Sequence, residues 1–103
     1  MNTMLHLINK SPTDRNSLDS CLRLAKPGAS VLLLEDGVYA ALSKASSAAA
    51  VNQRMGDLTF YVLGPDVSAR GLDDKPLIDG INVVDYGGFV DLVVEHEVAQ
   101  SWL

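Results

Sequence analysis

Cys21 is the strongest potential nucleophile in this chain of 103 residues, and it lies in the middle of a predicted helix. Apolar residues recur at helical spacing over residues 16–26, and Pro27-Gly28 cannot continue the helix. At about 100° per residue, Cys21 falls near the centre of an apolar arc, opposite Asp19 and Arg23, which have ion-pair spacing. The arc contains Leu18, Cys21, Leu22, Leu24 and Ala25. The pattern therefore predicts a packed core thiol.

The same position gives Cys21 little activation as a thiolate. Thiolates are favoured at helix N-termini or beside a fixed positive charge. Cys21 lies past the first turn, and Lys10 or Arg15 could approach it only through the preceding loop. A single cysteine forms no internal disulfide, and no CxxC or Cys/His cluster is present, which favours a reducing compartment and no structural zinc. A structural thiol and a functional one both stay open.

The two histidines do not complete a catalytic set. His6 lies within a predicted strand, where a hydrogen-bonded core imidazole is favoured over a general base. His96 stands between Glu95 and Glu97 near the C-terminus, which is typical of a solvated helix end. No GxSxG elbow and no histidine pair at metal-ligand spacing occur. We therefore expect no metal and no cofactor.

Strand and helix patterns alternate along the chain with short loops between them. Short apolar runs predict strands at residues 4–9, 30–35, 58–63 and 81–85. Helices are predicted at residues 16–26, with Asn16 as N-cap, and at 38–44, 66–70, with Asp66 as cap, and 89–97, with a further one over about 45–54. This alternation predicts one α/β domain over residues 1–103, with helices on both faces of a mostly parallel sheet of four to five strands.

The carboxyl ends of parallel strands are where ligands usually bind, and here they carry aspartates. Asp36, Asp66 and Asp85 each follow a predicted strand, next to glycine or proline. Their charge has the wrong sign for phosphate, and neither GxGxxG nor GxxxxGKS is present. We interpret these residues as turn and cap residues.

Composition narrows the classes of function. The net charge of −5 and pI near 4.7 disfavour direct nucleic-acid binding. Apolar runs such as VLLL are far shorter than the roughly 20 residues that cross a bilayer. The N-terminus has no positive segment and no cleavage site of a secretory signal, so a cytoplasmic location is expected.

The predicted last helix is apolar nearly all round, through Phe89, Val90, Leu92, Val93 and Val94. Such a helix is normally buried on more than one side. A short chain cannot easily bury it alone, and Trp102 and Leu103 add to the apolar surplus. We expect a protein partner rather than complete self-burial.

Four segments of the chain together resemble the DsrH/TusB family of sulfur-relay proteins. They are LHLINKSP (5–12), LLLEDGVYAAL (32–42), YVLGPDVSARGL (61–72) and VVDYGGFVDLV (83–93). The match is closest to the DsrH branch of sulfur-oxidising bacteria, which Asn9-Lys10-Ser11-Pro12, Asn16-Ser17-Leu18 and Cys21 resemble. Residues 45–57 match least.

The resemblance implies a three-layer α/β/α fold of the DsrE/F/H type and a place in a heterohexamer with DsrE/TusD-like and DsrF/TusC-like subunits. In that family the complex passes persulfide sulfur between carriers, and the best-established acceptor cysteine lies on the DsrE/TusD chain. The DsrH branch has a cysteine that matches Cys21, which makes Cys21 a candidate persulfide carrier.

Three functions follow as alternatives. The first is an accessory subunit of a sulfur-transfer complex that serves sulfur oxidation. The second is the same kind of subunit in a relay for 2-thiolation of tRNA wobble uridine, with tRNA contacted by later proteins. The third is a purely structural subunit that carries no sulfur. In each case the chain is not expected to be catalytic alone.

Overall fold

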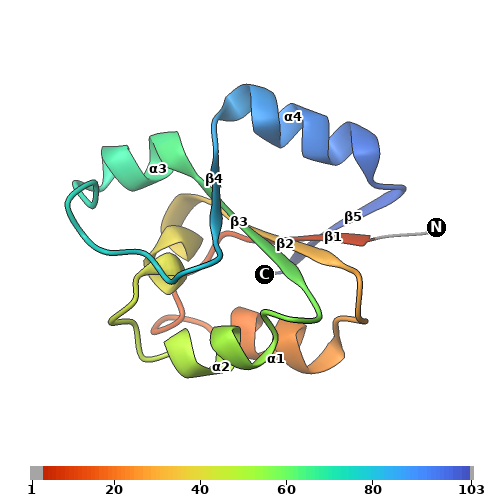
Figure 1. Ribbon diagram of the computed structural model, residues 1–103, viewed down its shortest axis with the longest axis horizontal. Coiled ribbons are helices and arrows are strands. Elements are labelled where there is room, and N and C mark those ends of the chain that lie inside the picture. The colour runs from red at the N-terminus through yellow and green to blue at the C-terminus, as the bar shows by residue number, and fades with distance from the viewer. Residues whose placement is uncertain (1–3, 103) are drawn as a thin grey trace.

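The computed structural model describes residues 4–102, which alternate between strands and helices around one sheet (Figure 1). The strands are β1 Met4–Ile8, β2 Ser30–Leu33, β3 Thr59–Leu63, β4 Asn82–Val84 and β5 Val98–Trp102. The helices are α1 Ser17–Leu24, the 3₁₀ helix η1 Glu35–Ala41, α2 Ala48–Gln53, α3 Gly64–Ala69 and α4 Tyr86–Glu95.

The strands described form a parallel sheet in the order β4-β3-β2-β1-β5. Strand β2 lies at the centre, and all of its residues are buried, as expected of a strand covered on both faces. Figure 1 shows α1 and α2 together on one side of the sheet and α4 on the other. This arrangement confirms the predicted three-layer α/β/α fold.

The two faces of the sheet are packed very unequally. On the α1 side, Ile8, Val31 and Phe60 belong to a large cluster of buried residues that also includes α1 and α2 side chains. On the α4 side, the buried cluster consists of Leu5, Leu32 and Leu92, with partly buried neighbours around it. Side chains alternate along β1, so Ile8 belongs to the first cluster and Leu5 to the second.

Helix α1 has the predicted position but differs in two details. Asn16 occupies the predicted N-cap position of α1, but its side chain makes no capping hydrogen bond. Leu24 is 69% exposed and does not belong to the buried arc, because it lies in the last turn of α1, at the edge of the covered face. The predicted ion pair between Asp19 and Arg23 is present at 3.6 Å on the exposed face.

Several boundaries differ from the sequence prediction for local reasons. Residues 35–41 form a 3₁₀ helix instead of a helix at 38–44. Helix α3 begins at Gly64, so Asp66 lies inside its first turn and is not its cap. Helix α4 begins at Tyr86, three residues earlier than predicted, because Asp85 accepts a hydrogen bond from the backbone N–H of Gly88 at 2.8 Å.

The largest addition is β5, in the tail for which the sequence predicts no element. Residues 98–102 pair in parallel with β1 along its whole length, from Met4 opposite Val98 to Ile8 opposite Trp102. Most of this edge strand is exposed, so it lacks the apolar run that marks the inner strands. Leu103 lies outside the described residues.

Candidate functional site

Cys21 lies on the inner face of α1 and has no exposed surface. It belongs to the large buried cluster, together with Leu18 and Leu22 of the same helix. The helical spacing that put Cys21 at the centre of an apolar arc therefore predicted its burial correctly. In this conformation a sulfur donor has no direct path to the thiol.

The electrostatic surroundings also keep Cys21 protonated. Burial raises the pKa of the Cys21 thiol to about 12, and the positive charge of Arg54 offsets this only in part. At neutral pH a thiol with this pKa is a thiolate in only about one molecule in 10⁵, and the thiolate is the nucleophile. Cys21 in the folded chain is thus a poor attacking group.

Arg54 is the charged residue near Cys21 that sequence reasoning missed. Its guanidinium donates to the backbone carbonyls of Leu22 and, at 2.9 Å, of Ala25, at the end of α1. Its Nε also lies 3.4 Å from a carboxylate oxygen of Asp57. A cation at a helix C-terminus satisfies unpaired carbonyls and complements the helix dipole. Arg54 therefore ties the residues after α2 to the end of α1.

At the carboxyl edge of the sheet, the aspartates are engaged in structural contacts. Asp66 Oδ2 accepts a hydrogen bond of 2.6 Å from the backbone N–H of Glu35, which has the unusual φ of +50°. Asp36 Oδ1 lies 3.0 Å from Arg70 Nε in an ion pair. These contacts join η1 to α3 and support the interpretation of the aspartates as turn residues.

A close contact with the end of β1 requires glycine at position 37. A Cβ at this position would overlap the backbone carbonyl oxygen of Ile8, so the chain can pass the end of β1 only without a side chain. The Leu34 N–H donates to the same carbonyl at 3.0 Å. The carboxyl edge is therefore closed by backbone at β1 and β2.

His6 forms the polar contact between β1 and β5. Its side chain is 4% exposed, and Trp102 Nε1–H donates to His6 Nδ1 at 3.0 Å. Because the indole is only a donor, His6 must accept at Nδ1 and carries its proton on Nε2 when neutral. Burial lowers the pKa of His6. The prediction of a hydrogen-bonded core imidazole agrees with this geometry.

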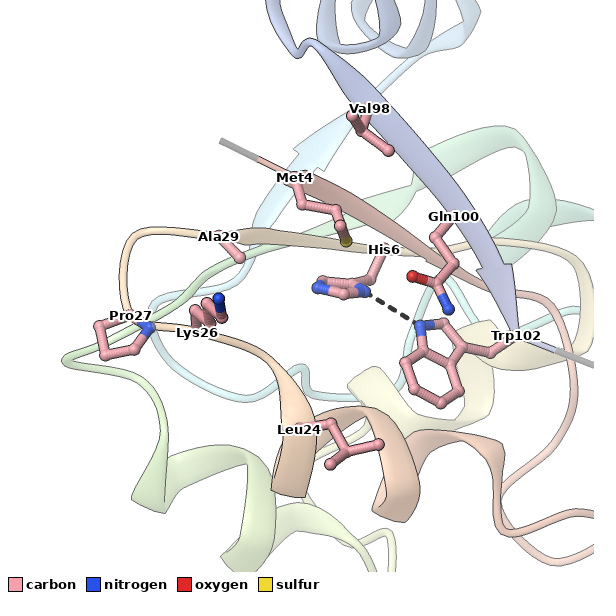
Figure 2. A pocket seen from close by; sticks show the side chains of 9 residues that line it. All are labelled: Met4, His6, Leu24, Lys26, Pro27, Ala29, Val98, Gln100 and Trp102. Atoms are coloured by element: carbon pink, nitrogen blue, oxygen red, sulfur yellow. Dashed lines mark hydrogen bonds between the residues drawn. The ribbon is translucent and has the colours of Figure 1, made fainter. Parts of the chain in front are cut away.

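A hollow of about 360 Å³ lies beside this pair, between β1, β5 and the end of α1. Figure 2 shows His6 and Trp102 pointing toward each other over it, with Lys26 and Leu24 on the α1 side. It contains no cysteine, and the His6 ring nitrogen that faces Trp102 is already bonded. The hollow therefore contains no thiol that could carry sulfur.

His96 is bonded at both ring nitrogens, in contrast to the predicted solvated helix end. Nδ1 lies 2.7 Å from the Leu92 carbonyl oxygen and Nε2 lies 3.0 Å from Ser30 Oγ. A carbonyl only accepts, so Nδ1 donates, and the neutral ring accepts the Ser30 hydroxyl at Nε2. His96 thereby ties the end of α4 to the beginning of β2.

By their geometry and hydropathy, the described residues contain neither a metal-ligand cluster nor a membrane-spanning helix. Among residues 4–102, no group of three or more histidine, cysteine, aspartate or glutamate side chains is arranged to hold a metal ion. The helices within the same residues are too short or too polar to cross a bilayer.

The comparisons with known proteins identify the family. A family model described as DsrH like protein matches residues 10–99. The TusB protein of Pectobacterium parmentieri is 36% identical over 100 residues, which cover 96% of this chain and all of that protein. The TusB protein of Shigella flexneri is 39% identical over 101 residues, with the same coverage. The chain belongs to the DsrH/TusB family. It is thus a member of a sulfur-relay family, as its sequence segments indicated.

Solved structures agree on the fold. The YchN protein of E. coli superposes with a TM-score of 0.81 at 16% identity and covers 99% of this chain and 100% of its own. The MTH1491 protein of Methanobacterium thermoautotrophicum gives a TM-score of 0.75 at 18% identity, with 98% and 99% coverage. At these identities the likeness shows the fold alone.

Within the family, these curated relatives bear the name TusB, whereas the family model is described by the name DsrH. The closer likeness to the DsrH branch stays a prediction.

Proposed function

We propose that this chain is a TusB-like subunit of a cytoplasmic persulfide relay that supplies sulfur for 2-thiolation of tRNA wobble uridine. The observation that carries this proposal is the similarity, at 36–39% identity over the full length of the relatives, to proteins named TusB. Its partners in the proposal are DsrE/TusD-like and DsrF/TusC-like subunits, in a hetero-oligomer.

The burial of Cys21 supports an accessory role rather than sulfur transfer by this chain alone. Persulfide transfer requires a thiolate to attack the outer sulfur of a donor persulfide, which forms a new persulfide and releases the donor thiolate. Cys21 is the only cysteine of the chain, and it has no exposed surface and a pKa of about 12. In the proposal, the chain shapes the complex and a partner subunit holds the reacting thiolate.

The charge of the chain supports an indirect relation to tRNA. A net charge of −5 repels a phosphate backbone, so the proposal leaves contact with tRNA to other proteins.

A relay that serves sulfur oxidation is the second candidate. It is favoured by the DsrH-like family model over residues 10–99 and by the likeness of Asn9-Lys10-Ser11-Pro12 and Cys21 to the DsrH branch. The two candidates share the chemistry of sulfur transfer and differ in the final acceptor.

Deletion of the gene separates the two candidates. We expect 2-thiouridine to disappear from digested tRNA, as measured by mass spectrometry of nucleosides, and to return when the chain is supplied again. Unchanged 2-thiouridine together with a loss of sulfur oxidation would overturn the tRNA proposal in favour of the second candidate. Supplying Cys21→Ser in the same strain tests the carrier role: the accessory role predicts recovery, and the carrier role predicts none.

A further inference from the structure

The outer side of α4 is an apolar surface that the described chain leaves uncovered. Among the ten residues of α4, Leu92 is the one that is buried. Four exposed side chains fall within about 100° of the helix circumference on the opposite side. This set, called the α4 face below, consists of Tyr86, Val90, Val93 and Val94, which are 60%, 60%, 43% and 77% exposed.

The α4 face lies on the outside of the thinly packed layer of the fold. Figure 1 shows α4 as the outermost element on its side of the sheet. Beneath it, Leu7 and Tyr61 of the sheet, and Leu34 directly after β2, are only partly buried. Valines that stay largely exposed on the outside of a helix remove little apolar area from water in the isolated chain, whereas a contiguous apolar surface is typical of an interaction site.

The charge around the α4 face is acidic. Residues 1–75 carry eight acidic and eight basic side chains, whereas residues 76–103 carry five acidic side chains and no lysine or arginine. The whole net charge of −5 therefore comes from the segment that contains α4. Asp91 and Glu95 are exposed on α4 itself, and Glu97 is exposed directly after it.

The apolar α4 face and the acidic charge near it together indicate which kind of partner binds there. Two copies of this chain joined through their α4 faces would bring together the Asp91 side chains that border these faces and two acidic C-terminal segments, which is unfavourable. An anionic membrane surface is repelled in the same way. A different protein chain with an apolar centre and a basic rim fits both the apolar face and its charge.

We propose that the α4 face binds another protein chain through an apolar surface bordered by lysine or arginine side chains. The proposal rests on the proposed function in one respect, because the probes are the DsrE/TusD-like and DsrF/TusC-like subunits of the same organism. Association is measured by co-expression, size-exclusion chromatography and titration of the purified subunits.

Val90→Lys/Val94→Lys tests the apolar part. Both side chains are mostly exposed, so the variant is expected to fold, which circular dichroism verifies. Its dissociation constant for the partner subunits should rise by at least about tenfold, because two positive charges enter an apolar contact opposite a basic rim. Leu24→Lys is the matched control, since Leu24 is 69% exposed on α1, on the opposite side of the sheet, and its replacement should leave binding unchanged.

Asp91→Lys/Glu95→Lys tests the charged part. We expect weaker association at low salt and a smaller effect of added salt than in the original chain, because screening weakens attraction between exposed charges. Asp14→Lys/Asp19→Lys changes the net charge equally in α1 and the loop before it, and should leave binding and its salt dependence unchanged.

Equal binding by the Val90→Lys/Val94→Lys variant and the original chain would overturn the proposal, as would no binding of the original chain to either subunit. A homodimer or a vesicle complex disrupted by the same substitutions would also overturn it. The tRNA measurement tests the proposed function separately. If 2-thiouridine depends on the chain but substitutions in the α4 face do not change binding, the proposed function stands and only the α4 face is rejected.

Discussion

Alkylation of Cys21 in the folded chain is expected to be at least about a thousandfold slower than in the unfolded chain at pH 8. Burial raises the pKa of Cys21 from its ordinary value of 9.0 to about 12. The thiolate fraction at pH 8 therefore falls from about 10⁻¹ to about 10⁻⁴, a factor of about 10³. The complete burial of the side chain adds a barrier to the reagent.

The assay follows incorporation of iodoacetamide by intact-protein mass spectrometry, in buffer and in a concentration of guanidinium that unfolds the chain. Cys21→Ala, which has no other cysteine to react, gives the background of the assay. Raising the pH from 8 to 10 should accelerate labelling of the folded chain about tenfold per unit, since the thiolate fraction rises in that proportion.

Labelling of the folded chain within about tenfold of the unfolded rate would refute the argument, because it would require an accessible, readily ionised thiol. The same assay on the assembled complex tests the carrier prediction for Cys21. A carrier must become reactive on assembly and gain about 32 Da, the mass of one sulfur atom, from a persulfide donor. Protection and an unchanged mass, while a partner cysteine gains sulfur, would leave Cys21 a core residue.

Three further predictions concern the contacts that hold the fold. Gly37→Ala should lose at least about 3 kcal/mol of unfolding free energy in urea, because its Cβ would overlap backbone at the end of β1, whereas Gly56→Ala, with open space around its Cβ, should change it by less than about 1 kcal/mol. Arg54→Met should lose about 2 kcal/mol and melt at a lower temperature, because two carbonyls at the end of α1 lose a charged donor. Trp102→Phe should lose about 1 kcal/mol at pH 8, because the hydrogen bond to His6 is removed.

The His6 contact also sets a pH dependence, whose sign follows from its lowered pKa. Below the ordinary value of 6.5 the unfolded chain binds a proton that the folded chain resists, so unfolding free energy is fully present above pH 6.5 and falls as the pH decreases toward the folded pKa. In His6→Asn the side-chain oxygen can accept the same indole proton but does not titrate. The decrease in unfolding free energy that His6 causes between pH 7.5 and 5.5 should therefore vanish in this variant.

Clear results would contradict these expectations. Equal stability of the Gly37→Ala and Gly56→Ala variants would show that η1 does not need its close approach to β1. An Arg54→Met variant as stable as the original chain would show that the hydrogen bonds from Arg54 do not stabilise the end of α1. A pH profile unchanged by His6→Asn would assign the titration to another group.

The sequence predicted most of the layers because their signals are local. Apolar runs at residues 30–35 and 58–63 identify buried strands, and a helical period followed by Pro27-Gly28 identifies α1. Strand β5 escaped prediction because an exposed edge strand has no such run, and its position depends on pairing with β1, which lies more than ninety residues earlier.

The contacts around the candidate site depended on the tertiary structure in the same way. Spacing along α1 correctly placed Cys21 among buried residues, since side-chain direction repeats every 3.6 residues. It did not indicate that Arg54, from the end of α2, would be the neighbouring cation, or that Asp66 would bond to the backbone of Glu35. Both contacts join segments about thirty residues apart, and no local period encodes them.

The amino-acid sequence by itself determined the family, the α/β alternation, the burial of Cys21 and the acidic character of the last 28 residues, because each depends on residue type and local spacing. The tertiary structure decided the strand order, the pairing of β5 with β1 through His6 and Trp102, and which side of α4 stays uncovered. These features depend on which distant segments meet, and that is fixed only when all the strands have paired and the helices have packed on the sheet.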